Sequence, residues 1–151
     1  MIELTGPRPR WIDGGTCGAD AIEMIIRNER PDLIVIEKPV ALHCPEANVH
    51  VLATTFLAGE LAERARHTGV NTMTVTNPQW RMALIGRAIR ESNQDREVKF
   101  ALKRIVDGLP KRTNCHARDA AGAALIGARI WAREHPLRRP IGPMVGARRN
   151  W

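Results

Sequence analysis

The chain has 151 residues, of which 44% are hydrophobic and 26% charged, with a net charge of +7 and an isoelectric point near 10.3. This composition fits one globular domain and excludes a collagenous, wholly disordered or membrane-spanning protein, since no run approaches the ~20 apolar residues that cross a bilayer. The start of the chain lacks a signal pattern and three widely spaced cysteines give no disulfide framework, so we expect a cytoplasmic protein with a polyanionic partner.

Hydrophobic periodicity predicts alternating helices and strands. Apolar residues at helical spacing predict a helix from about Gly18 to Arg30. The short β-branched run Leu33–Glu37, between two prolines, predicts a buried strand. The remaining predicted elements are a helix at about 47–67, a strand at 70–75 and helices at about 79–89, 95–106 and 116–134.

The two ends of the chain lack this periodicity. Residues 2–12 have room for one strand. The last fifteen residues, 137–151, contain four arginines and no acidic residue, which predicts a basic and flexible tail. We therefore expect one domain over residues 1–136, followed by this tail.

Glu37 and Asn77 mark the place where the sequence predicts chemistry. The strand–helix–strand order allows the two strands to be parallel neighbours joined by a helical crossover. Ligands of open α/β sheets bind beyond the carboxyl ends of the strands, and both residues lie there. Glu37 is thus a candidate metal ligand; the alternative is a carboxylate that is solvated or paired with Lys38.

A second candidate group opens the last predicted helix. His116 and Asp119 are three residues apart and so share a helix face. The small residues at 120–124 would let this helix lie close to a sheet. Together with Glu37, Asp119 would supply the oxygen ligands that divalent metals prefer. The alternative is helix capping, in which Asn114 or His116 starts the helix and Asp119 complements its dipole.

The order and spacing of these motifs resemble the RuvC-like Holliday-junction resolvases of the RNase H-like superfamily. The resemblance rests on four segments: PDLIVIEKP (31–39), MTVTNPQWR (73–81), DREVKFALKRIV (95–106) and HARDAAGAAL (116–125). It implies an α/β, RNase H-like fold with a small mixed sheet and flanking helices. It also implies a Mg²⁺-dependent endonuclease, with Mn²⁺ as substitute, that cuts branched DNA as a homodimer. The 47–67 helix is the expected dimer interface.

The resemblance also assigns roles to single residues. Glu37 and Asp119 would hold the metal, and His116, one turn before Asp119, would bind metal or position the attacking water. The Trp80–Arg81 pair and Lys99 match family positions near the DNA, and Lys103 lies in the same predicted basic stripe. Trp80 has an alternative place in the hydrophobic core.

One departure from the family pattern leaves two functions open. The family begins with a strand that carries a first catalytic aspartate, whereas here the first strands appear to be missing. Either this carboxylate is absent, or Asp13 replaces it, or the start of the chain lies inside a longer gene. If it is absent, the protein would be an inactive RNase H-like protein that binds branched or duplex DNA. A helix-rich protein-interaction module is a third possibility.

Overall fold

The structure, a computed structural model, describes residues 1–4, 8–14, 19–40, 45–87 and 91–136. The predicted tail, residues 137–151, lies outside these ranges. The elements in chain order are β1 (Ile2–Glu3), β2 (Arg10–Trp11), α1 (Ala19–Glu29), β3 (Leu33–Lys38), α2 (Pro45–His67), β4 (Asn71–Thr76), α3 (Asn77–Ile85), α4 (Glu91–Ile105) and α5 (Cys115–Glu134). No helix among the described residues is both long and apolar enough to cross a membrane.

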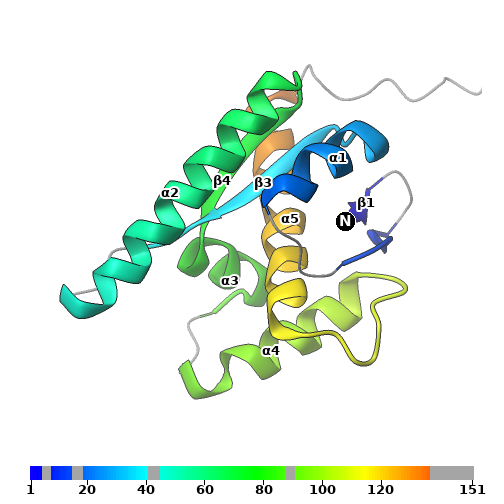
Figure 1. Cartoon of the computed structure of the whole chain (residues 1–151). Coiled ribbons are helices and arrows are strands. Elements are labelled where there is room, and N and C mark those ends of the chain that lie inside the picture. Colours follow the sequence, from blue (N-terminus) through cyan, green and yellow to red (C-terminus); the bar gives the residue numbers. More distant parts are fainter. Residues whose placement is uncertain (5–7, 15–18, 41–44, 88–90, 137–151) are drawn as a thin grey trace, which may run out of the picture.

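The predicted α/β class is confirmed, and from α1 onward every predicted helix and strand is present. β3 and β4 are parallel neighbours, with Glu37 opposite Val75 at the carboxyl end of the pair. The crossover between them is α2, a single long helix (Figure 1). The expected juxtaposition of Glu37 with the start of α3 therefore follows directly from the register of two strands.

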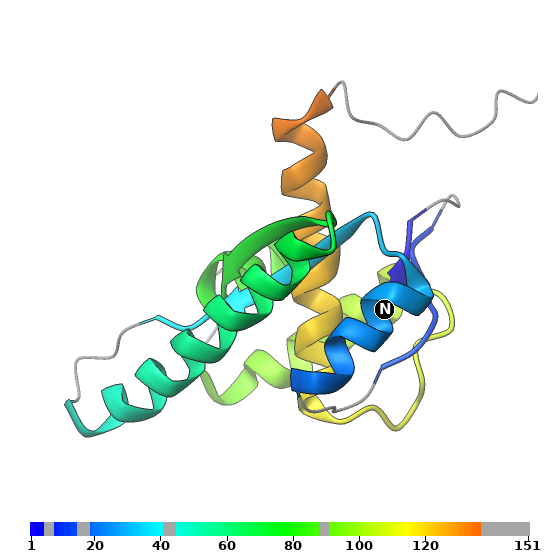
Figure 2. The ribbon, with the colours of Figure 1, turned by 45° about the horizontal axis from the view of Figure 1, so that its top comes forward.

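The β3–β4 pair lies between helices α2 and α5 (Figure 1, Figure 2). Successive side chains of a strand point to opposite faces. The strand lines an apolar hollow together with residues of α1 and α2, and the side chain of Val35 also lies against Gly127 of α5. Glu37, two residues after Val35, thus belongs to the face that α5 covers.

The beginning of the chain differs from the single strand that was predicted. β1 and β2 are two-residue strands that pair antiparallel with each other. A backbone bridge also joins Arg10 to Asp107, just after α4. Within the described residues neither strand pairs with β3 or β4. Pro9 explains why this segment forms no longer strand, because proline has no N–H to donate to a ladder.

The hydrophobic core joins β4 to the three helices α3, α4 and α5. Trp80 of α3 is fully buried at its centre. Its ring lies so close to Gly122 of α5 that a Cβ atom there would be 2.5 Å from Trp80 Cζ3. The other buried members are Val75, Leu84, Val98, Leu102, Val106, Ala121, Ala123, Leu125 and Ile126. The small residues at 121–123 thus let α5 approach α3, whereas the sequence predicted that residues 120–124 would bring this helix close to a sheet. The close approach of α5 to β3 is at Gly127, which lies against Val35.

Gly122→Ala is expected to destabilise the protein by ~1–3 kcal/mol, the usual effect of overpacking a core. The added methyl group would meet the ring of Trp80, which is fully buried. Gly59 of α2 is the matched control, because a methyl group added there would have no heavy atom within 4 Å. Gly59→Ala should leave stability unchanged or raise it by up to ~1 kcal/mol. Urea denaturation of both variants measures the difference, and equal stabilities would contradict this packing.

Candidate functional site

The start of α3 is fixed directly after the end of β4. Thr76 is the N-cap, and its hydroxyl accepts a hydrogen bond from the backbone N–H of Gln79, while the Gln79 side chain accepts from the N–H of Thr76. This capping box begins the helix at Asn77, two residues earlier than predicted. As a result, the first turn of α3 stands at the carboxyl edge of the two strands, beside Glu37.

Glu37 is held by two side chains of this first turn. Its Oε1 accepts a hydrogen bond from Asn77 Nδ2 at 3.1 Å, and its Oε2 accepts one from Trp80 Nε1 at 3.2 Å. The alternative of a pair with Lys38 is not formed among the described residues. Each carboxylate oxygen has two lone pairs. Glu37 is therefore oriented by the protein, and the described residues leave one acceptor position unused on each of its oxygens.

Asp119 is held by Arg81, the residue that follows Trp80 in α3. Its Oδ2 lies 2.7 Å from Arg81 Nη2. Arg81 also reaches α4, where its Nη1 lies 3.0 Å from Gln94 Oε1 and 3.4 Å from Asp95 Oδ1. The dipeptide Trp80–Arg81 thus connects the two predicted metal ligands, one through each side chain.

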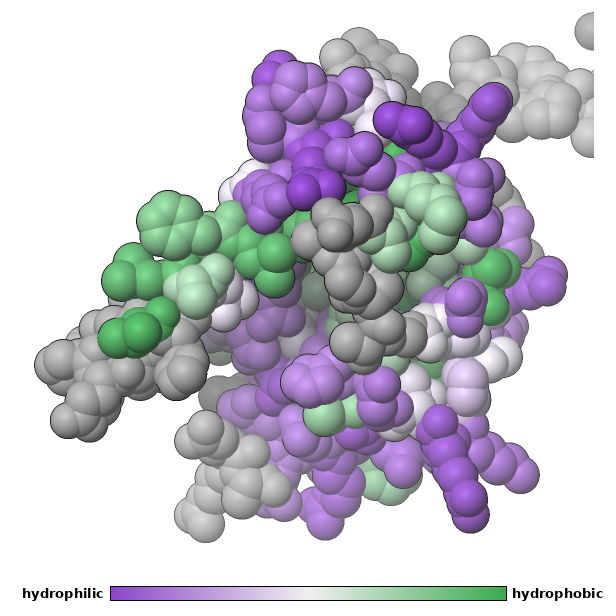
Figure 3. All heavy atoms as spheres, viewed as in Figure 1, coloured by the Kyte–Doolittle hydropathy of each residue, from purple (hydrophilic) through white to green (hydrophobic). Residues whose placement is uncertain are grey.

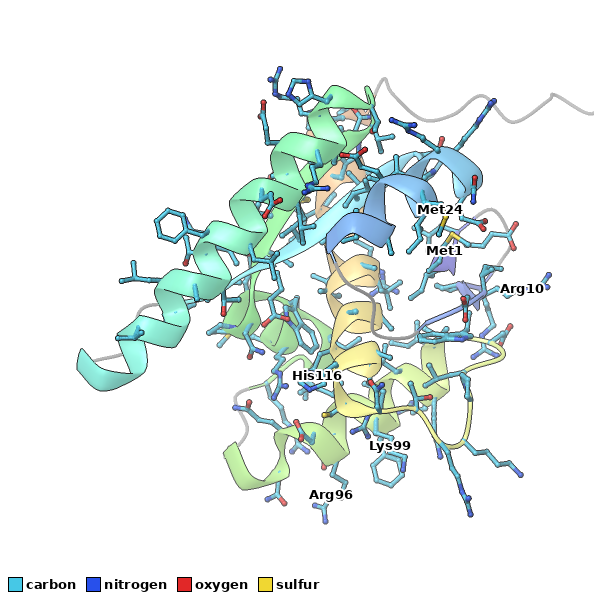
Figure 4. All side chains as sticks on the ribbon, in the orientation of Figure 1. Met1, Arg10, Met24, Arg96, Lys99 and His116 are labelled. Carbon is cyan, nitrogen blue, oxygen red and sulfur yellow. The ribbon has the colours of Figure 1, made fainter. Side chains whose placement is uncertain are left out.

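The remaining predicted residues lie on α4 and at the start of α5. His116 is exposed, and Figure 4 shows it at the start of α5, above Lys99 on α4. Lys103 is also exposed, and neither lysine forms an ion pair with a described residue. The cap of α5 is Asn114, whose Oδ1 accepts from the N–H of Ala117 at 2.7 Å. Asn114 therefore caps the helix. His116 does not cap it, and Asp119 lies beyond its first turn.

Neither Trp80 nor Asp13 takes the functional role that the sequence left open for it. Trp80 occupies its alternative place in the core, so its ring does not face solvent for base stacking. Asp13 is exposed and accepts from the N–H of Gly14, and no three His, Cys, Asp or Glu side chains within the described residues form a metal-binding group. Asp13 therefore does not complete a cluster with Glu37 and Asp119.

The hydrogen-bonding roles of Trp80 and Arg81 toward the two acids were not predicted. The available signal was the T-N-P-Q capping box directly after a strand, which places the following Trp80 and Arg81 beside the strand end.

Comparison with known proteins identifies the fold. No protein-family model and no curated protein sequence matches the chain. Solved structures do match, among them RuvC of Thermus thermophilus in complex with a Holliday junction substrate, with 16% identity, a TM-score of 0.58 and 86% of each chain covered. A further Thermus thermophilus RuvC structure matches with 16% identity and a TM-score of 0.59, over 87% of this chain and 86% of that one. The fold is RuvC-like.

The RuvC-like fold confirms the architecture that the sequence motifs implied. At 16% identity this likeness concerns the fold, and the roles of single residues have to be argued from the site itself. The arrangement can do two things chemically. It presents two carboxylates from distant parts of the chain to one helix turn, and it already balances one of them with a positive charge, the guanidinium of Arg81.

These two carboxylates offer the kind of ligand atom that a divalent cation takes. Oxygen ligands are the type that Mg²⁺ prefers. Glu37 retains free lone pairs, and the position beside Asp119 accepts a cationic group, because Arg81 stands there. Glu37 and Asp119 would therefore hold the ion, with His116 near the start of the same helix as Asp119.

Proposed function

We propose that the protein is a divalent-metal-dependent endonuclease that acts on branched DNA, as the resemblance to Holliday-junction resolvases implied. The observation that supports this most is that two adjacent residues of α3 bind the two acids, Trp80 to Glu37 and Arg81 to Asp119. These acids are 82 positions apart in sequence, yet adjacent residues of α3 bind both of them. The RuvC-like fold and the net charge of +7 support the same proposal.

In this proposal the residues of the site would have the following roles. Glu37 and Asp119 hold the metal, and the hydrogen bonds from Asn77 and Trp80 keep the Glu37 carboxylate oriented. His116, exposed near the beginning of α5, binds metal or positions the water. A bound Mg²⁺, or Mn²⁺ in its place, supplies activation of the water and stabilisation of the leaving oxygen.

DNA would be bound mainly through its phosphates. Lys99 and Lys103 lie on α4, next to α5, and their ammonium groups are not neutralised by described acidic residues. Arg81 is largely buried and pairs with Asp119 and Asp95, so it would reach a phosphate only by leaving these partners. Phosphate contacts position a protein without reading the bases, so specificity would come from branch geometry.

The test is cleavage of a synthetic four-way junction beside a linear duplex of the same sequence. Cleavage of the junction is expected with Mg²⁺ and is expected to stop with EDTA. The Asp119→Asn variant, assayed in parallel, should still bind the junction but no longer cut it. Junction binding without cleavage by the wild-type protein would contradict the proposed activity.

One observation favours a second function, that of a catalytically inactive protein that binds branched or duplex DNA. Both acids are already bound by protein donors, and the described residues supply no third acidic or histidine ligand as a cluster. Such a protein would bind DNA with a steep salt dependence, and neither Mg²⁺ nor Asp119→Ala would affect its binding. The junction assay separates the two functions.

A homodimer through α2 is part of this proposal. Apolar side chains on the outer face of α2 are highly exposed: Val49 by 67%, Leu52 by 58% and Phe56 by 79%. Their spacing of three and four residues places them on one side of the helix, and Figure 3 shows hydrophobic atoms gathered over this part of α2. A second copy would cover this face, and two equivalent strands of a four-way junction suit a two-fold symmetric enzyme.

Phe56→Glu is expected to convert the dimer into a monomer, because it replaces the most exposed side chain of this apolar face with a charge. Sedimentation velocity measures the change. Phe100→Glu is the matched control, since Phe100 is 59% exposed on α4, away from α2. A wild-type protein that is already monomeric, or a Phe100→Glu variant that dissociates equally, would contradict a dimer through α2.

A further inference from the structure

Arg81 contacts a proposed metal ligand, Asp119, and two residues of α4 at the same time. One nitrogen, Nη2, lies 2.7 Å from Asp119 Oδ2 on α5. The other, Nη1, lies 3.0 Å from Gln94 Oε1 and 3.4 Å from Asp95 Oδ1 on α4. Arg81 would therefore still be bound by its α4 partners if its contact with Asp119 were broken.

The contact with Asp119 is the more shielded of the two ion pairs. The side chains of Arg81 and Asp119 are 14% and 25% exposed, whereas that of Asp95 is 64% exposed. Charges interact more strongly where solvent screens them less. The Arg81 charge therefore neutralises Asp119 in the absence of metal, and it would also repel any second cation at the same carboxylate.

Arg81 is also incompletely satisfied in its present position. Its Nε is buried and has no hydrogen-bond partner among the described residues. Its Cζ lies 5.2 Å from the centroid of the Trp80 ring, a cation–π contact that limits how far the group moves. A buried donor without a partner is unfavourable. The unpaired Nε thus lowers the stability of the present position of Arg81, in which the other two nitrogens are bound.

We propose that Arg81 is a displaceable counter-ion of Asp119, which releases Asp119 and keeps its contacts with Gln94 and Asp95 when a divalent cation binds. This inference rests on the proposed function, because it takes Asp119 as a metal ligand. Arg81 and the metal then exclude one another at this carboxylate. Arg81 consequently lowers metal affinity and keeps Asp119 neutralised until metal is present.

The test is a titration with Mn²⁺ followed by electron paramagnetic resonance, which reports bound metal without any cleavage assay. Arg81→Met removes the charge and retains the aliphatic stem beside Trp80. It should bind Mn²⁺ at least tenfold more tightly than the wild-type protein, a difference of ~1.4 kcal/mol. Arg87→Met is the matched control, because Arg87 is exposed and contacts only Glu97, at 3.9 Å, among the described acids. Its Mn²⁺ affinity should equal that of the wild type.

Equal or weaker Mn²⁺ binding by Arg81→Met would overturn the inference. If circular dichroism shows that this variant is unfolded, Arg81→Gln decides, because glutamine also removes the charge. Tighter Mn²⁺ binding is expected for it, and no rise in affinity overturns the inference. The Asp119→Asn variant distinguishes failure of this inference from failure of the proposed function. If it binds Mn²⁺ as tightly as the wild type, the metal site itself is refuted. If it binds more weakly while Arg81→Met is unchanged, only the role of Arg81 is lost.

Discussion

Glu37→Gln is expected to reduce junction cleavage in Mg²⁺ by at least ~100-fold while junction binding persists. Even groups that only support a metal ligand typically affect metal affinity or activity by 10–100-fold, so loss of a ligand's charge has at least that effect. The amide also presents an N–H to Asn77 or Trp80, both of which donate to Glu37, so one hydrogen bond is lost. Single-turnover cleavage and a binding titration on the same junction measure the two effects.

Glu29→Gln is the control for this substitution. Glu29 is exposed at the end of α1, and the same chemical change there should alter neither cleavage nor binding. Cleavage by Glu37→Gln at the wild-type rate would contradict the assignment of Glu37 as a ligand. Loss of DNA binding together with cleavage would instead assign Glu37 a structural role.

Trp80→Ala is expected to destabilise the protein by ~3–5 kcal/mol, the range for removal of a large buried aromatic side chain. Trp80 is 0% exposed and fills the space between α3 and the glycine at position 122. In addition, its indole N–H no longer holds Glu37. In a domain of this size the loss should lower the Tm by roughly 10 °C, measurable by thermal unfolding.

Trp131→Ala provides the comparison within the same chain. Trp131 is only partly buried and stacks on His135 near the end of α5, with ring centroids 3.8 Å apart. Its removal should lower the Tm clearly less than removal of Trp80 does. Equal losses for the two tryptophans would contradict the central position of Trp80 in the core.

The elements from α1 onward were predictable because their signals are local. The run Leu33–Glu37 is short, β-branched and bounded by prolines, and the apolar spacing in the helices marks one face. The parallel pairing of β3 and β4 also followed, since a strand, a long helix and a second strand leave few topologies. The place of Glu37 at the carboxyl edge could be predicted from this alone.

The contacts within the site could not be predicted in the same way, because they join residues far apart in the chain. Trp80 and Arg81 are adjacent in sequence, yet one binds Glu37 and the other Asp119. Which side chain points to which acid depends on where α3 begins, and the capping box moved that start to Asn77. The N-terminal strands were mispredicted for a similar reason, since their bridge to Asp107 is a long-range contact.

Crystals of the wild-type protein grown with saturating Mn²⁺ test the central claim most directly, because anomalous scattering locates the ion without reference to activity. An anomalous peak in contact with the carboxylates of both Glu37 and Asp119, with Arg81 released from Asp119 and still bound to α4, is the predicted result. A map without a peak there, in which Arg81 still pairs with Asp119, would contradict a metal site formed by these two acids.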